Sequence, residues 1–534
     1  MSTNDTTGGA AMAVGRGFGT RATLPVAILI AMIVAFLVHT LGPRADPREP
    51  PLIKPRIPFI GHIIGLMQHQ ANYHTRLRRL TNKPIATLPM LTGKMYAVWD
   101  PHLIASALRN KSLSTTPHTL DVAPIVTRLG AHTVELLRGP QGEPLLDRFM
   151  QHVIPGSLKG EHLQRLNTAA LAVLASQLSD LARQGACERL PNTWLWLRTL
   201  IATATSKALY GKHDPFGGNA AVENALWVLE RNLLKLTLNL PAALTPAGDR
   251  ARKTLAAALM PYYAARHDED PSASAFVRSR TAELRQVGIP TEDIARLETL
   301  LPFAALANTV PLLFWLICFI FSRSELTTKL REEVGGLIEK REGAVVTLLT
   351  GSVVEERCPQ LMSCYRETLR QAVHQVSTRT AVQDTTVSDK NGRQYLIRAG
   401  NVVQLSIGTS HALDEYWGSD ADEFKPDRFL GRKVDSDDEP GGVKAMRTAL
   451  LPFGGGTHLC PGRHFAFAEM MAVIVTLLLG YEVEPLEGAE WKLPAFATRS
   501  LIDAVTKPAN HGEGFGVRIR RRQGWEEAQW AYEM

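Results

Sequence analysis

The sequence has 534 residues, of which 45% are hydrophobic and 21% are charged. This is a globular composition, so it excludes wholesale disorder, a collagen-like repeat and a coiled-coil rod. The five cysteines are too few and too scattered for a disulfide scaffold, and none forms the CxxC pair of a structural zinc site. We therefore expect a thiol-bearing protein of a reducing compartment.

The net charge of +7 is modest for a chain of this length. Part of it gathers in an arginine cluster at residues 518–522, and no basic stripe with interleaved aromatic residues accompanies it. Such a stripe is what a nucleic-acid-binding protein would show, so we expect no nucleic-acid partner. A basic patch that docks an acidic protein or an anionic membrane is the better interpretation.

Residues 22–41 form an apolar run in which His39 is the only ionisable residue. A helix of about 20 residues spans a bilayer, and the apolar core of a signal peptide is shorter. We predict a lumenal N-terminus at 1–21 and a transmembrane anchor at 22–42, with a cleaved signal peptide as the alternative. More Lys and Arg residues follow the run than precede it, so the bulk of the chain should be cytosolic.

The segment 43–58 is rich in proline, which fixes φ and removes backbone donors. It predicts a stiff linker that holds the body of the protein at a set angle to the membrane. No second linker interrupts residues 59–534, so this part should form one large catalytic domain.

The body reads as mainly α with small β-sheets. Apolar residues at three-to-four spacing predict helices at 160–184 and 221–240. Strand patterns occur at 96–99 and 515–519, and two more flank the Ala-Gly-Asn turn at 399–401. The last two, at 395–398 and 402–405, predict a hairpin.

The segment 291–322 predicts a helix of about 30 residues that begins at a Pro-Thr-Glu-Asp start signal. Its apolar part is either a second membrane span or a helix buried through the centre of a large domain. Pro311 has no N–H, so the carbonyl of Ala307 loses its helical partner beside Asn308 and Thr309. This polar notch either seats water or dioxygen, or is a tolerated kink closed by the Thr309 hydroxyl.

Residues 451–464 read LPFGGGTHLCPGRH and precede an apolar helix. The glycines at 454–456 permit positive φ and let backbone N–H groups point at the sulfur of Cys460. The start of a helix favours a thiolate, and a thiolate held in this way is a good axial ligand for iron. The alternatives are an inert buried cysteine and a phosphate cradle, but the lysine and glycine spacing of phosphate loops are missing.

The pattern Phe453-x-x-Gly456-x-His458-x-Cys460-x-Gly462 resembles the haem-ligand signature of the cytochrome P450 haem-thiolate monooxygenases. The resemblance implies the cytochrome P450 fold and haem b (iron protoporphyrin IX) bound at this loop, with the Cys460 thiolate as the metal ligand. With the anchor and the proline linker, which look like those of microsomal and fungal members, it covers essentially the whole chain.

Two further motifs match the same family. Glu367-Thr-Leu-Arg370 resembles its ExxR helix, and Phe424-Lys-Pro-Asp-Arg428-Phe429 resembles its PERF segment. By resemblance, Glu367, Arg370 and Arg428 form a buried structural triad. His458 and Arg379 match positions that hold the haem propionates.

The central helix departs from the family pattern. Most members carry an acid followed by an alcohol that deliver protons to dioxygen, whereas here Asn308 and Thr309 occupy the window as candidate catalytic residues. The surrounding residues resemble the sterol 7α-hydroxylases, which use reductase electrons, and prostacyclin synthase, which isomerises an endoperoxide without them. An amide cannot itself ionise, so the reaction type stays open.

The favoured hypothesis is a monooxygenase of the endoplasmic reticulum membrane that takes NADPH-derived electrons from cytochrome P450 reductase, with cytochrome b5 as a second partner. Its substrate would be an apolar polycyclic molecule, such as a sterol, terpenoid or other secondary metabolite. The alternative is a haem-thiolate isomerase or dehydratase that works without external electrons. A multi-span membrane protein or a haem sensor is a third, weaker hypothesis, motivated by the apolar run near 300–321.

Overall fold

The computed structural model of the chain describes residues 46–55, 60–91, 93–183, 186–431, 443–486, 490–513 and 515–534. The predicted N-terminal segment 1–21 and the predicted anchor 22–42 lie outside the described residues. The predicted linker is described only at residues 46–55.

Helices make up most of the described chain, as the sequence predicts. The helices of the first half are α2 (Ile63–His69), α3 (Asn72–Thr81), α4 (Pro101–Arg109), α5 (Thr116–Thr127), α6 (Ala131–Arg138), α7 (Gly142–Arg148), α8 (Ile154–Ser157), α9 (Gly160–Asp180), α10 (Thr193–Tyr210), α11 (Ala220–Thr237) and α12 (Pro246–Ala264). Those of the second half are α13 (Ala275–Gln286), α14 (Thr291–Leu297), α15 (Leu300–Leu306), α16 (Thr309–Phe321), α17 (Ser324–Gly335), α18 (Ser352–Arg357), α19 (Pro359–Ala372), α20 (Ile407–Ser410), α21 (Asp414–Trp417), α22 (Val443–Ala449) and α23 (Arg463–Gly480).

Within the described ranges, the strands form four small sheets. The largest has the order β1-β2-β10-β7-β3, two others have the orders β11-β12-β4 and β13-β6-β5, and β8 pairs with β9. Their bounds are β1 (Ile85–Pro89), β2 (Lys94–Val98), β3 (Leu113–Ser114), β4 (Cys187–Leu190), β5 (Ile338–Glu342), β6 (Val345–Leu349), β7 (Val376–Ala381), β8 (Thr385–Ser388), β9 (Gln394–Ile397), β10 (Val402–Ser406), β11 (Tyr481–Pro485), β12 (Val517–Arg521) and β13 (Gln529–Glu533).

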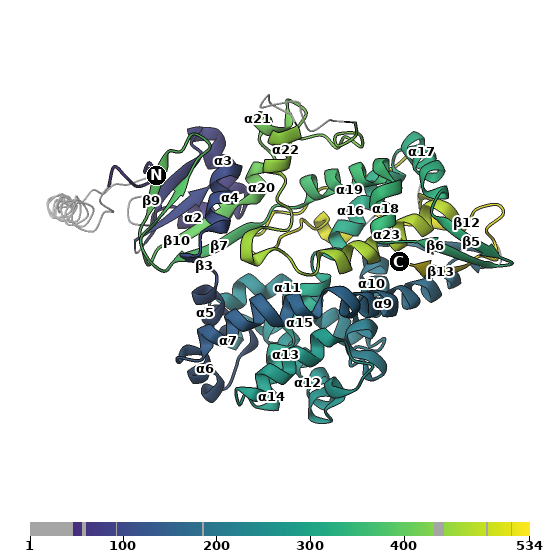
Figure 1. Cartoon of the computed structure of the whole chain (residues 1–534), viewed down its shortest axis with the longest axis horizontal. Coiled ribbons are helices and arrows are strands. Elements are labelled where there is room, and N and C mark those ends of the chain that lie inside the picture. Colours follow the sequence, from purple (N-terminus) through teal and green to yellow (C-terminus); the bar gives the residue numbers. More distant parts are fainter. Residues whose placement is uncertain are drawn as a thin grey trace, which may run out of the picture.

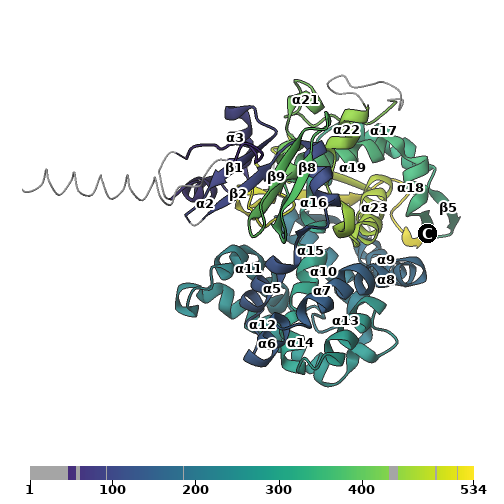
Figure 2. The ribbon, with the colours of Figure 1, turned by 60° about the vertical axis from the view of Figure 1, so that its left-hand side comes forward.

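Two apolar helices form the centre of the molecule. Every residue of α16 is buried, and so is nearly all of α23. They pack against each other and against α17, and α16 also contacts α10 and α19. Figure 1 shows the five-stranded sheet with α2–α4 at one end and the β5, β6 and β13 sheet at the other. Figures 1 and 2 show α5–α7 and α11–α15 as a helical layer along one side.

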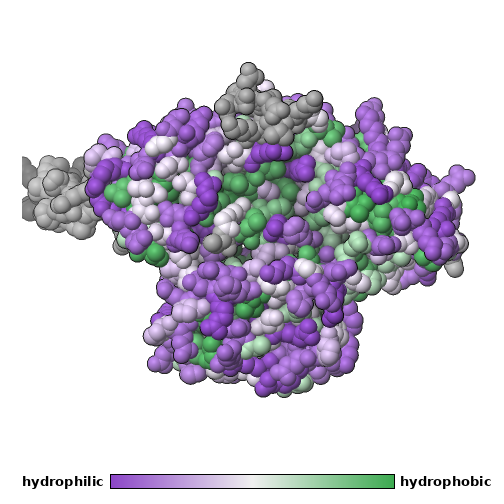
Figure 3. Space-filling model, in the orientation of Figure 1, coloured by the Kyte–Doolittle hydropathy of each residue, from purple (hydrophilic) through white to green (hydrophobic). Residues whose placement is uncertain are grey.

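The distribution of hydropathy on the surface is that of a protein whose helices bury their apolar faces. Hydrophilic residues cover most of the outer part of the face in Figure 3, and hydrophobic residues gather in its middle.

Local capping explains where helix α4 begins. Asp100 accepts a hydrogen bond from the N–H of Leu103 at 3.0 Å and is followed by Pro101, so α4 starts there.

The predicted hairpin at 395–405 is wrong, although both of its strands exist. β9 pairs with β8, whereas β10 pairs with β2 and β7. The turn between them bonds to β7 instead, because Gly400 donates to the carbonyl of Ala381 and Ala381 donates to that of Asn401. Alternation and a glycine turn predict strands correctly but do not say which neighbour a strand will take.

The continuous helix predicted over 291–322 is broken twice. It forms α14, α15 and α16, with interruptions at Glu298–Thr299 and at Ala307–Asn308. Its length and hydropathy would suit a membrane span, as would those of α23, but 78% and 83% of their most apolar windows are buried inside the body. The segment therefore lies in the core of the body, as one of the two sequence-based interpretations predicts, and does not form a second membrane span there.

The described part of the proline-rich segment lies against β1 of the five-stranded sheet and against β9 of the two-stranded sheet. Ile53 donates to the carbonyl of Thr87, and Leu396 donates to that of Arg48. The Arg398 guanidinium bridges Asp46 and Asp384. These contacts hold residues 46–55 to the body of the protein.

Candidate active site

The cysteine loop is held closely against α4. Cys460 donates its N–H to the carbonyl of Phe453 at 3.0 Å, which closes the loop. Gly456 has a φ of +63°, and a Cβ there would lie 2.1 Å from the carbonyl oxygen of Leu108. Only glycine fits this approach. Phe453 packs its ring against the main core, and Gly462 is the residue that caps α23.

The surroundings of the Cys460 thiol shift its pKa in opposite directions. Burial raises its pKa, while the N–H groups of Gly462 and Arg463 and the Arg463 guanidinium lower it. The donors come from the start of α23, where the sequence places the cysteine. Arg463 also donates to the carbonyl of Cys460 at 2.9 Å, which ties the loop to the helix.

Arg379 and His458 lie near each other beside this loop. Arg379 projects from β7, is only 3% exposed and forms no ion pair within the described residues. Burial lowers its pKa to about 10. The pKa of His458 is lowered by burial and then by the charge of Arg379. A buried guanidinium without a carboxylate partner is costly, so this corner suits an anionic group from a bound molecule.

Asn308 and Thr309 lie at the break between α15 and α16, and their side chains differ in exposure. Thr309 is buried, and its hydroxyl donates to the carbonyl of Ala305 at 2.9 Å. Asn308 is exposed, as is Ala304 one turn earlier, although the segment around them is buried. The kink is thus closed by the Thr309 back-bond, and the Asn308 amide is the polar group on the accessible face of this helix.

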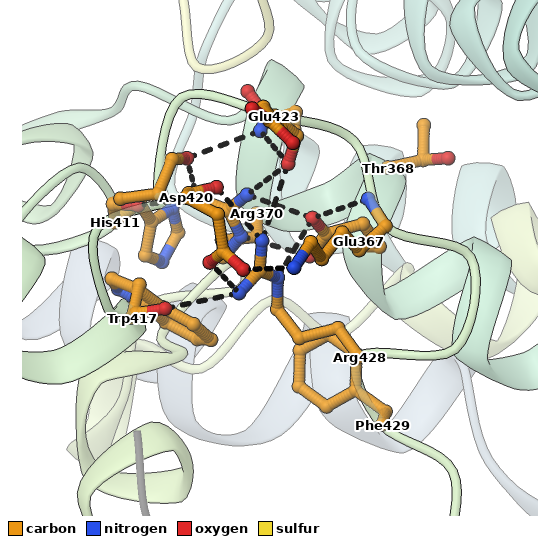
Figure 4. Close-up of polar contacts among 12 residues, drawn as sticks. Glu367, Thr368, Arg370, His411, Trp417, Asp420, Glu423, Arg428 and Phe429 are labelled. Carbon is orange, nitrogen blue, oxygen red and sulfur yellow. Dashed lines mark hydrogen bonds and ion pairs between the residues drawn. The ribbon is translucent and has the colours of Figure 1, made fainter. Parts of the chain in front are cut away.

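Glu367, Arg370 and Arg428 come together as the sequence motifs predict, and all three are buried (Figure 4). Arg370 donates to both carboxylate oxygens of Glu367, at 2.8 and 2.7 Å. Arg428 donates to the same carboxylate at 2.9 Å. Asp420 is a fourth member, 2.8 Å from Arg428, that the motif analysis missed. Two buried guanidiniums beside one carboxylate could have signalled the need for a second acid.

Arg370 and Arg428 also donate hydrogen bonds to backbone carbonyls of the segment between α20 and Arg428. Arg370 donates to the carbonyls of His411, Ala421 and Glu423. Arg428 donates to those of Trp417 and Asp420. A long segment whose one helix within the described residues is the short α21 is thereby fixed onto α19, which is the role expected of a structural triad.

A buried carboxyl group lies on α23, nine residues after the cysteine. The Thr205 hydroxyl donates to one oxygen of Glu469 at 2.7 Å, and the other oxygen has no partner within the described residues. Burial raises the pKa of Glu469 to about 8. In the unfolded chain this carboxyl ionises near its ordinary pKa of about 4.3, so the folded state loses stability as the pH rises from there to about 8.

We expect Glu469→Gln to gain stability over the parent by on the order of 3 kcal/mol between about pH 5 and about pH 8. Urea unfolding at several pH values measures the difference. Glu332→Gln, at an exposed position on α17, is the matched control and should show no such trend. A difference that stays flat across this range would contradict a neutral Glu469.

The comparisons with known proteins agree with one another. The Cytochrome P450 family model matches residues 245–508, a span that contains the triad helix and the cysteine loop. A cytochrome P450 monooxygenase of Gibberella zeae is 34% identical over 509 residues, which cover 94% of this chain and 95% of that protein.

Two further relatives are more distant. The cytochrome P450 monooxygenase nodJ of Hypoxylon pulicicidum is 28% identical, with 95% of this chain and 97% of that protein covered. The human 7-alpha-hydroxycholest-4-en-3-one 12-alpha-hydroxylase is 24% identical, with 82% of this chain and 87% of that protein covered.

Proposed function

Because this chain belongs to the cytochrome P450 family, we propose that it is a membrane-anchored monooxygenase in which the Cys460 thiolate would hold the iron of a haem b group. Members of the family bind haem through a cysteine thiolate. The observation that carries the proposal is the cysteine loop, which is closed by Phe453, approaches α4 through Gly456 and presents Cys460 ahead of α23.

The residues present fit a haem group. Arg379 and His458 would pair with its propionates, since the described residues give Arg379 no carboxylate of its own. Phe453, Gly456 and Gly462 would shape the loop beneath it. When bound, haem supplies the oxygen chemistry, and a thiolate ligand favours cleavage of the O–O bond.

The accessible Asn308 amide is the group that would orient water or substrate when haem is bound. The Thr309 hydroxyl is already committed to the carbonyl of Ala305, so it would act as a brace for the kink rather than as a proton donor. An amide donates and accepts hydrogen bonds without ionising, so any proton it helps to deliver must come through ordered water.

We expect Asn308→Ala to lower kcat by about tenfold or more, because a positioned proton relay contributes at least this much. Thr309→Val should lower thermal stability slightly and leave kcat within about threefold, since only a local back-bond is lost. NADPH consumption and product formation are measured together. The opposite ranking, with Thr309→Val the more harmful, would assign proton delivery to the threonine.

A groove of about 620 Å³ beside the cysteine loop is the proposed docking face for NADPH-cytochrome P450 reductase. Pro461, Arg463 and His464 line it from one side and Lys159 at the start of α9 from the other. Among the described residues that line it, Glu355 is the only acidic one. A basic face close to Cys460 would attract an acidic electron donor, and cytochrome b5 would use the same face.

Lys159→Glu should slow reductase-supported turnover on the order of tenfold at low ionic strength, because charge reversal opposes electrostatic steering. The deficit should shrink as salt screens the interaction. Lys390→Glu, on the exposed turn between β8 and β9, is the control. Turnover is measured against reductase concentration. If both variants turned over equally, the reductase would not dock on the face that contains Lys159.

For the substrate we propose an apolar polycyclic molecule, such as a sterol, a terpenoid or another secondary metabolite. The support is the human relative, whose name describes a steroid hydroxylase, together with the fungal monooxygenases. The likeness to fungal, microsomal members supports a fungal source and the endoplasmic reticulum membrane. A haem-thiolate isomerase is the second candidate, favoured by Asn308 in place of an acid, and product formation without NADPH would distinguish it.

A further inference from the structure

A second pocket, of about 470 Å³, lies between α3, the C-terminal end of α19 and the segment that carries Arg499. The helices α3 and α20 lie side by side at this position (Figure 1). None of the lining residues belongs to the cysteine loop or to α14–α16. The pocket is therefore separate from the candidate active site.

Three guanidinium groups from distant parts of the chain line this pocket. Arg76 and Arg79 stand one turn apart on α3, and Arg499 comes from the C-terminal region. Arg76 contacts His69 at 3.1 Å, which does not neutralise it. Arg370 also lines the pocket, but its charge is already met by Glu367.

One carboxylate faces these cations. The Asp422 side chain is 82% exposed and lies 3.9 Å from Arg79, so it forms a weak surface pair. Burial lowers the pKa of Arg499, and the charge of Asp422 opposes this only as a secondary effect. The pocket thus keeps an excess of positive charge that the described side chains do not balance.

Guanidinium groups converging on one cavity recognise phosphate, because each can donate two parallel hydrogen bonds to its oxygens. An exposed apolar side chain stands beside these cations, because Leu80 lines the pocket and is 70% exposed. Arginines beside exposed apolar side chains suit a surface where headgroups and acyl chains meet. The predicted anchor ends shortly before this part of the chain.

We propose that this pocket binds the phosphate of an anionic phospholipid, with Arg76, Arg79 and Arg499 as its ligands. The site would set how the body rests on an anionic membrane. It does not depend on Cys460 or on the proposed reaction, so either proposal can fail without the other.

The test uses the full chain in neutral detergent and follows thermal unfolding with three additives: dihexanoyl phosphatidic acid, dihexanoyl phosphatidylcholine and inorganic phosphate. Phosphatidic acid should raise the melting temperature in a saturable way, and phosphatidylcholine should not. Arg76→Gln/Arg79→Gln should weaken the apparent affinity by about tenfold or more, because two charge-assisted pairs are lost. Both arginines are exposed, so the variant should melt like the parent without additive.

Arg138→Gln, at an exposed position on α6, is the control and should bind phosphatidic acid like the parent. Equal saturable stabilisation by inorganic phosphate, lost in the double variant, would overturn the lipid assignment and make the ligand a soluble phosphate. Stabilisation that survives in the double variant, or no stabilisation by any additive, would overturn the pocket as an anion site.

Discussion

Glu367→Ala is expected to destabilise the protein by about 3–5 kcal/mol, the cost of leaving buried charges without their partner. Arg370 and Arg428 would then face each other in the interior, with only Asp420 remaining near Arg428. The total stability of a folded protein is about 5–15 kcal/mol, so the variant should yield little folded protein. Thermal unfolding and soluble yield measure the effect.

Glu367→Gln keeps the shape of the side chain and removes its charge, so we expect it to lose nearly as much stability as the alanine variant. Glu356→Ala, at an exposed position on α18, should unfold like the parent. If Glu367→Ala melted within a few degrees of the parent, the three side chains would be a tolerated cluster rather than a structural element.

Cys460→Ser should abolish monooxygenase activity and leave the fold intact. The serine hydroxyl replaces a polarisable thiolate with a poor iron ligand, while the loop contacts of Phe453 and Gly456 remain. We expect turnover to fall by at least about a thousandfold, on the scale seen when an essential catalytic group is removed. The ferrous carbon monoxide spectrum should lose the band of thiolate-ligated haem.

Cys187→Ser is the matched control for this substitution, because Cys187 is an exposed free cysteine on β4. It should keep both activity and spectrum. A Cys460→Ser protein that retained the thiolate spectrum would show that another cysteine binds the iron.

Local patterns in the sequence predict much of this structure. The helical runs predicted at 160–184 and 221–240 match α9 and α11 closely. The strands predicted at 96–99, 395–398, 402–405 and 515–519 overlap β2, β9, β10 and β12. Glu367 and Arg370 share a helix face because they stand three residues apart, whereas Arg428 lies 61 residues after Glu367 and is placed beside them by the resemblance of its motif to the family.

Features that depend on distant pairing could not be predicted. The partners of β10 are β2 and β7 rather than β9, because tertiary contacts and not the intervening turn select them. Asp420 joins the triad through an irregular segment that has no periodicity. The pocket of Arg76, Arg79 and Arg499 joins residues more than four hundred positions apart, so no window of sequence reveals it.

The central helix is an intermediate case. Pro311 correctly signals a kink beside Asn308 and Thr309, but two interpretations of the notch remain open from sequence alone. Burial decides between the two side chains, because the hydroxyl turns inward to Ala305 and the amide stays accessible. The sequence points to both residues, and packing decides which of the two side chains is accessible.

The central claim is that this chain inserts oxygen with electrons from a reductase. Membranes that contain the full chain and NADPH-cytochrome P450 reductase are incubated with a lipid extract, with and without NADPH, and product masses are followed. We predict a product heavier by one oxygen atom that forms only with NADPH and is absent for Cys460→Ser. A product of unchanged mass, or one lighter by water, that forms without NADPH would contradict the account.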